Sequence, residues 1–111
     1  MLLPNVQSAI VSREKIVDYL VNPEHPDGAG KAAFFTAMGF RADRWQDLAN
    51  ALLELAKSQP VFATLASAHG SKYIVDGAID TPSGRSVTVR SVWIVDHEGL
   101  TPRLVTAYPH Q

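Results

Sequence analysis

The stretch KYIVDGAIDTPSGRSVTVRSVWIV, residues 72–95, contains two runs rich in β-branched and aromatic residues, with the short sequence TPSG between them. Such runs favour β-strands, and a connection that contains proline and glycine favours a hairpin turn. A second turn sequence, DHEGLTP, separates the latter run from RLVTAY at 103–108. The stretch therefore predicts consecutive antiparallel strands, because short turns join strands that are neighbours in a sheet.

The residues before position 60 have a helical pattern instead. Its strongest part places apolar residues at the spacing i, i+3, i+4, i+7, i+8 and i+11, namely Trp45, Leu48, Ala49, Leu52, Leu53 and Ala56. This pattern predicts a helix that ends ahead of Pro60, since the residue before a proline avoids the α region. Asp43 followed by Gln46 resembles a capping box at the start of this helix.

Two shorter helices are predicted nearer the N-terminus. Ser12 is a suitable N-cap for a helix over 13–21, which ends where Pro23 follows. A second helix is expected to begin near Gly30 and to end before Gly39, because glycine commonly takes the left-handed conformation just after a helix.

Helices followed by strands are typical of the α+β class, with the helices packed on one face of the sheet. We expect about three N-terminal helices, within a helical part over about 12–59, and a three- to four-stranded antiparallel C-terminal sheet over about 61–109. The sequence VFATLASA at 61–68 fits either a strand or a continuing helix. A chain of 111 residues has the size of one ordinary domain, so we predict a single domain over 1–111.

The composition excludes several classes of protein. With 46% apolar and 19% charged residues, wholesale disorder is not expected, and no window approaches the roughly 20 apolar residues of a membrane span. The chain has no cysteine, and MLLPNVQSAI lacks the features of a signal peptide, which fits a cytoplasmic protein without membrane contact. A net charge of −1 excludes RNA binding through bulk positive charge, so an RNA contact needs a local cluster of cations.

The segment NPEHPDGAGKAAFF, residues 22–35, joins the first two predicted helices. It is not a phosphate-binding loop, because Ala32 stands where that motif needs Ser or Thr and His25 where it needs glycine. Free backbone amides at a helix start together with Lys31 would still attract an anion. The alternative is that Lys31 is an ordinary solvated residue after a loop.

None of the four histidines, His25, His69, His97 and His110, has the spacing of a metal site, and we predict neither a metal nor another cofactor. His97 falls in a predicted turn and His110 near the C-terminus, so both are expected to be in solvent. His25 and His69 are candidates for acid–base catalysis, because an imidazole titrates near neutral pH.

The predicted strands also place polar residues together. If DHEGLTP turns symmetrically about Gly99, Arg90 faces Tyr108 and Thr106 shares their side of the sheet. A shift of one residue would disperse the group, and the sequence alone does not decide the register. An arginine in mid-strand must reach solvent, pair with a carboxylate such as Asp76, or bind an anionic ligand. Trp93, in contrast, is expected in the core.

Such a group suits metal-independent RNA cleavage, which needs a base for the 2′-hydroxyl, a cation for the phosphorane charge and an acid for the leaving oxygen. Arg90 is the first candidate for the cation, because its donors have a fixed geometry. The supporting candidates are Lys31 and Lys72 as cations, Tyr108, His25 and His69 as acid–base groups, and Thr106 as an orienting hydroxyl.

The phrases YLVNPEHPDGAGKAAFFTAMGF, KYIVDGAIDTPSGR, VRSVWIV and PRLVTAYP resemble a family of small, uncharacterised bacterial domains over about residues 3–109. Similar domains also form the C-terminal modules of adhesin-like proteins, where polymorphic toxins carry their effector. The resemblance implies a fold like that of ribonuclease toxins of the barnase, colicin and RelE type. The family's recurring polar positions would be Asn22, His25, Lys31, Lys72, Tyr73, Arg85, Arg90, Trp93, Arg103, Thr106 and Tyr108.

From the resemblance and the polar strand residues, the first hypothesis is a bacterial toxin-like domain that acts as a metal-independent endoribonuclease in a toxin–antitoxin or contact-dependent system. Its substrate would be RNA, bound by Lys31, Lys72, Arg85 and Arg103, and its partner a cognate antitoxin or immunity protein. The alternative is a non-catalytic protein-binding module, itself an immunity- or antitoxin-like partner of a toxin. The near-neutral charge departs from that of a typical ribonuclease and leaves both hypotheses open.

Overall fold

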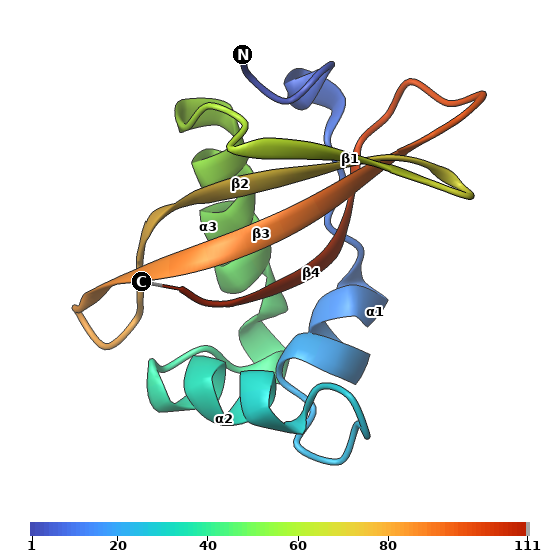
Figure 1. Ribbon diagram of the computed structural model, residues 1–111. Helices are drawn as coiled ribbons and strands as arrows, with labels where there is room; N and C mark the ends of the chain where they lie inside the picture. Colours follow the sequence, from blue (N-terminus) through green and yellow to red (C-terminus); the bar gives the residue numbers. More distant parts are fainter. Residues whose placement is uncertain (111) are drawn as a thin grey trace.

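A computed structural model describes residues 1–110 as helical segments followed by a four-stranded antiparallel sheet, which confirms the predicted α+β arrangement (Figure 1). The elements are η1 (Val6–Ser8), α1 (Arg13–Lys15), η2 (Ile16–Leu20), α2 (Ala29–Ala37), η3 (Ala42–Arg44), α3 (Trp45–Ser58), β1 (Ala63–Ser67), β2 (Gly70–Asp80), β3 (Ser86–Asp96) and β4 (Arg103–Pro109). No helix among these residues is long and apolar enough to cross a membrane.

The sheet is a meander in which the strands lie in the order β1-β2-β3-β4. The segment at 61–68, which the sequence left undecided, contributes the edge strand β1. Figure 1 shows α3 running behind the sheet, whereas no described helix lies in front of it. Helices α1 and α2 lie near β4, and both make contacts with that strand.

The core lies between α3 and the sheet. Leu48, Leu52 and Leu55 of α3 are buried, as Val75 and Trp93 are on the strands. At Gly77 a Cβ atom would lie 2.6 Å from Cδ1 of Leu55, so the helix packs closely on β2 here and a larger residue would require the Leu55 side chain to shift. The expectation that Trp93 is a core residue is confirmed.

The helix boundaries agree with the sequence at most points. The hydroxyl of Ser12 accepts a hydrogen bond from the backbone N–H of Lys15 at 3.2 Å and caps α1. The predicted helix then continues as a π-helical turn, η2, closed by a bond from the N–H of Val21 to the carbonyl of Ile16 at 3.0 Å. Gly39 follows α2 with φ at +96°, as expected.

The capping box predicted for α3 is wrong. The helix begins at Trp45 after the short turn η3, and no side chain caps it. Asp43 instead forms two hydrogen bonds with Arg41, at 2.9 and 3.0 Å. The preceding arginine therefore competes successfully for the carboxylate that the sequence assigned to the helix start.

The register between β3 and β4 is the predicted one at the positions of the polar side chains. Arg90 lies opposite Tyr108, and Val92 lies opposite Thr106. Closer to the turn the symmetry is broken, because Trp93 pairs with Leu104 and the register shifts by one residue. The irregularity lets Leu104 join Trp93 in the core while Thr106 keeps its place beside the helices.

Candidate functional site

Tyr19 connects the helical part to the edge of β4. The hydroxyls of Tyr19 and Thr106 are hydrogen-bonded at 2.9 Å. The ammonium groups of Lys15 and Lys31 lie 5.3 and 5.4 Å from the centre of the Tyr19 ring, within the range of cation–π attraction. The ring of His25 packs edge-on against it, with 4.9 Å between the ring centres. Two cations, an imidazole and a hydroxyl therefore surround the side chain of Tyr19.

The loop at 22–28 closes onto Tyr19 because residue 28 is a glycine. A Cβ atom at Gly28 would lie 2.7 Å from the backbone oxygen of Tyr19 and 2.9 Å from its Cδ1. At Gly30, in contrast, a Cβ atom would have no neighbour within 4 Å. The loop therefore carries His25 to the tyrosine through a close approach that only Gly28 permits.

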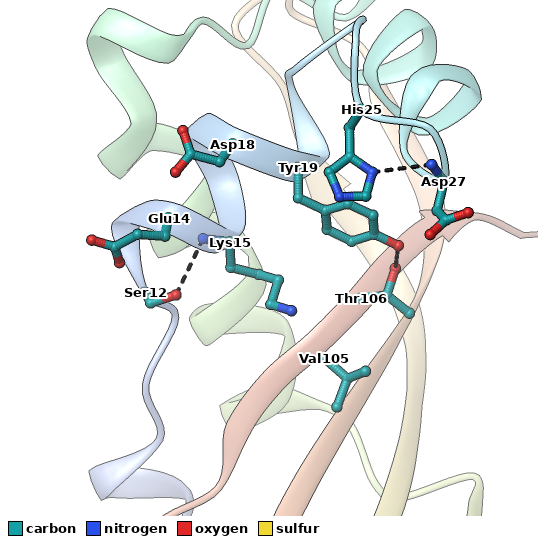
Figure 2. Close-up of a pocket in the computed structure, with 9 residues that line it drawn as sticks. All are labelled: Ser12, Glu14, Lys15, Asp18, Tyr19, His25, Asp27, Val105 and Thr106. Atoms are coloured by element: carbon teal, nitrogen blue, oxygen red, sulfur yellow. Dashed lines mark hydrogen bonds between the residues drawn. The ribbon is translucent and has the colours of Figure 1, made fainter.

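An open hollow of about 560 Å³ lies between this loop, the first helical turns and β4. Figure 2 shows Lys15 pointing toward Thr106, whereas the side chains of Glu14 and Asp18, which also line the hollow, extend away from Thr106. A neighbouring hollow of about 510 Å³ is lined by Lys31 and Tyr108 and shares Asp27 with the first. We call the two hollows together the β4 groove.

The cations of the β4 groove are available to a ligand. Within residues 1–110, neither Lys15 nor Lys31 is in an ion pair with a carboxylate. The ammonium group of Lys31 donates a hydrogen bond to the backbone carbonyl of Asp27 at 3.1 Å, which places it without neutralising its charge. Glu14, Asp18 and Asp27 also line the groove, but an anion next to Lys15 or Lys31 would meet a positive charge that is not held in an ion pair.

The tautomer of His25 follows from its hydrogen bond. The backbone N–H of Asp27 donates to Nδ1 of the ring at 3.0 Å, so this nitrogen bears no proton. The proton of the neutral ring is then on Nε2. In this state His25 presents an N–H donor through its remaining nitrogen, which suits contact with a phosphate oxygen.

Arg90 pairs with a carboxylate of the neighbouring strand and is not left free for an anionic ligand. Its guanidinium donates two hydrogen bonds to Asp76, at 2.8 and 2.9 Å, and lies 5.1 Å from the centre of the Phe62 ring. The Arg90 guanidinium holds the pKa of the Asp76 carboxyl below its usual value, and Asp76 in turn raises the pKa of Arg90. Of the alternatives left open by the sequence, pairing with Asp76 is the one that occurs.

His110 was expected in solvent, and this is wrong. Its side chain is half-buried, with Nε2 lying 3.3 Å from Arg90 and 3.6 Å from Asp76. The backbone explains this, because the N–H of His110 bonds to the carbonyl of Thr88 at 3.0 Å and continues the pairing of β4 with β3. His97 is exposed, as expected.

The other predicted residues lie away from the groove. Lys72 is four residues from Asp76 on β2, or roughly 13 Å along the strand. The expectation that Lys72 lies beside Arg90 is therefore wrong. His69 is in the β1–β2 turn, and Arg85 is in the β2–β3 turn at the opposite end of the sheet. Arg103, at the start of β4, forms an exposed ion pair with Asp96 at 3.0 Å.

Four of the predicted residues do come together along β4, namely His25, Lys31, Thr106 and Tyr108. The sequence analysis missed Lys15 and Tyr19, although their i, i+4 spacing places them on one face of the first helical segment and was a usable signal. Within the described part of the chain no group of three His, Asp or Glu side chains is arranged to hold a metal ion. The site therefore consists of cations, hydroxyls, one imidazole and the carboxylates of Glu14, Asp18 and Asp27.

Comparison with known proteins gives a family and a fold. The model of the family described as Domain of unknown function (DUF6883) matches residues 2–111. No curated protein sequence matches the chain. Among solved structures, a chain of the contact-dependent growth inhibition toxin–immunity protein complex from Klebsiella pneumoniae 342 is similar, with a TM-score of 0.74 and 22% identity. The alignment covers 96% of this chain and 97% of that one, so the two share their fold over nearly their whole length.

Proposed function

The chain belongs to the DUF6883 family of domains of unknown function, and we propose that it is a toxin-like domain that cleaves RNA in the β4 groove. It would act without a metal, in a contact-dependent growth inhibition or toxin–antitoxin system, and a cognate immunity protein would be its partner. Support for the biological setting comes from the shared fold with a chain of the Klebsiella toxin–immunity complex. That likeness does not identify a reaction, so the chemistry is argued from the groove alone.

The observation that carries the proposal is the convergence of Lys15, His25, Lys31, Thr106 and Tyr108 on one open groove beside Tyr19. Their functional groups match the needs of phosphodiester cleavage, in which negative charge develops on the phosphate oxygens. Three different segments of the chain supply them. A packing role for the same residues would not require two lysines without carboxylate partners.

In the proposed reaction the 2′-oxygen attacks the phosphorus atom and the P–O5′ bond breaks. The proton of the 2′-hydroxyl passes to a base, and an acid supplies a proton to the 5′-oxygen, which leaves a 2′,3′-cyclic phosphate and a 5′-hydroxyl end. Lys15 and Lys31 stabilise the phosphorane charge. Tyr108 supplies the proton to the 5′-oxygen and solvent water takes the proton of the 2′-hydroxyl, while the Nε2–H of His25 contacts a phosphate oxygen and Thr106 orients the substrate from its bond with Tyr19.

Arg90 has a positioning role in this proposal. Its charge is taken up by Asp76, so it is not the main phosphate-binding group that the first hypothesis made it. It lies opposite Tyr108 on the adjacent strand and supports that side chain from the sheet. The cation next to the scissile phosphate is Lys31 instead, which lines the same hollow as Tyr108.

The test is incubation of purified protein with total RNA and with the tRNA pool in EDTA, followed by analysis of the product ends. We expect fragments with 2′,3′-cyclic phosphate and 5′-hydroxyl ends, and a loss of at least about tenfold in rate for Tyr108→Phe. Lys57→Met is the matched control, because Lys57 lies in the last turn of α3 and does not line the groove.

Two outcomes would overturn the proposal. One is the absence of cleavage by the wild-type protein. The other is an equal rate for Tyr108→Phe, which would remove the groove from the reaction. A domain that neither cleaves RNA nor arrests growth when induced without its genetic neighbour would instead be the non-catalytic binding module of the alternative hypothesis.

A further inference from the structure

The hollows along β4 continue beyond the cleavage site in both directions, and we infer that they receive a single-stranded segment of RNA laid along this strand. The inference rests on the proposed function and specifies its substrate. Lys15 and Ser12 also line a hollow of about 330 Å³ beside the β3–β4 turn, next to Arg103. At the other end, Pro109 also lines a hollow that contains Phe34 and His110.

The hollows form a series because neighbours share residues. Lys15 belongs to the hollow at the turn and to the first part of the β4 groove, and Asp27 belongs to both parts of the groove. Together the hollows lie along β4 from Arg103 to His110. The seven residues of β4 span roughly 20 Å at the rise of a β-strand. That length accommodates about four nucleotides, the lower end of the site sizes of single-strand-binding domains.

Positive charges are spaced along this path. Arg103 stands at its start, Lys15 between the first two hollows and Lys31 in the third. The ion pair of Arg103 with Asp96 is exposed on both sides, and such pairs contribute little, so a phosphate can replace the carboxylate. Glu14, Asp18 and Asp27 also line the first part of the β4 groove, although the side chains of Glu14 and Asp18 extend away from Thr106 (Figure 2). A phosphate chain would therefore meet cations at intervals.

Half-buried rings line the same path, and they favour a single strand over a duplex. His25 lines the first part of the β4 groove, Tyr108 its second part and Phe34 the hollow beyond it. Rings of this kind stack with bases that are unpaired, whereas the bases of a duplex are stacked on one another and not accessible. The substrate segment is therefore a loop, an end or another unpaired stretch of RNA.

The test is fluorescence anisotropy with labelled 2′-O-methyl oligoribonucleotides, which cannot be cleaved through a 2′-hydroxyl, in lengths of two, four, six and eight nucleotides. We expect affinity to rise from two to about four nucleotides and then to level off, with at least about tenfold weaker binding of the annealed duplex. Lys15→Met should lower the slope of log affinity against log salt by about 0.7, and Lys57→Met should not.

Equal affinity for the duplex and the single strand would overturn the inference, as would an unchanged salt slope in Lys15→Met. The two proposals fail in different ways. If the groove is not a nuclease site, no RNA is cleaved in any form. If only the single-strand inference is wrong, the protein still cleaves RNA, but it cuts an annealed duplex as fast as the unpaired strand.

Discussion

The hydroxyl of Tyr19 and the hydroxyl of Thr106 lie 2.9 Å apart and join the π-helical turn η2 to the edge strand β4 across 87 positions of sequence. Both residues line the first part of the groove, and the bond holds the ring against which Lys15, His25 and Lys31 lie. Since π-helical turns are rare and concentrate at functional sites, the position of Tyr19 on one of them agrees with a role beyond packing.

Replacement of Tyr19 by phenylalanine should weaken the protein modestly, because it removes the bond to Thr106 and keeps the ring. We expect a loss of about 0.5–1.5 kcal/mol in the free energy of unfolding, measured by urea denaturation. Tyr73→Phe is the control, since no described residue forms a hydrogen bond with the hydroxyl of Tyr73. Equal stability of Tyr19→Phe and the wild type would show that the bond is not formed in solution.

The two glycines of the sequence DGAG should respond to substitution in opposite ways. Gly28→Ala places a methyl group against the backbone and ring of Tyr19, and we expect a loss of about 1–3 kcal/mol or more. Gly30→Ala meets open space in the first turn of α2 and should be neutral or stabilising by up to about 1 kcal/mol. Thermal unfolding of both variants checks this, and a similar loss at both positions would contradict the close packing of Gly28.

The pair of Asp76 and Arg90 should make stability depend on acid pH. Hydrogen bonds from Arg90 lower the pKa of Asp76 in the folded protein, while the carboxyl of the unfolded chain titrates near about pH 3.9. A group with a lowered folded pKa stabilises the fold above its unfolded pKa, and this contribution disappears as the pH falls through the folded pKa. Urea unfolding between neutral and strongly acid pH should therefore give a steeper loss for the wild type than for Asp76→Asn. Parallel curves would argue against the pair.

Ser91 should be sensitive to removal of its hydroxyl. This buried group accepts a hydrogen bond from Nε1 of Trp93 at 2.9 Å and donates one to the carbonyl of Val75 at 2.8 Å. Ser91→Ala leaves the indole N–H without its partner in the core, and we expect a loss of about 1–3 kcal/mol. Ser86→Ala, at the exposed start of β3, is the control. A loss no larger than in the control would mean that the indole finds another acceptor.

The sheet could be predicted because its strands and turns depend on residues that are close together in the sequence. Alternating residues and short turns define the strands of 72–95 and 103–108, and a symmetric turn sufficed to place Arg90 opposite Tyr108. The register shift next to Leu104 could not be predicted, because it depends on which side chain fills the core beside Trp93. The capping box failed for a related reason, since Arg41 competes for Asp43.

The site was predictable only in part, because it is formed by contacts between residues that are far apart in the sequence. Lys31 and Tyr108 were both candidates, yet the sequence does not show that they line one hollow, and the close approach of Gly28 to Tyr19 is visible only in the folded chain. Arg90 ranked first as a phosphate group because an arginine in mid-strand is unusual. The structure accounts for it through Asp76, one of the partners considered from the sequence.

The central claim is that the β4 groove cleaves RNA with the charge of Lys31 at the reacting phosphate. Its most direct test is the rate constant for cleavage of one purified tRNA in EDTA by the wild type, Lys31→Met and Lys57→Met, each with its folding checked by circular dichroism. The account predicts that Lys31→Met is at least about tenfold slower than the wild type, while Lys57→Met is unchanged. Equal rates for all three proteins, or no cleavage by any of them, would contradict it.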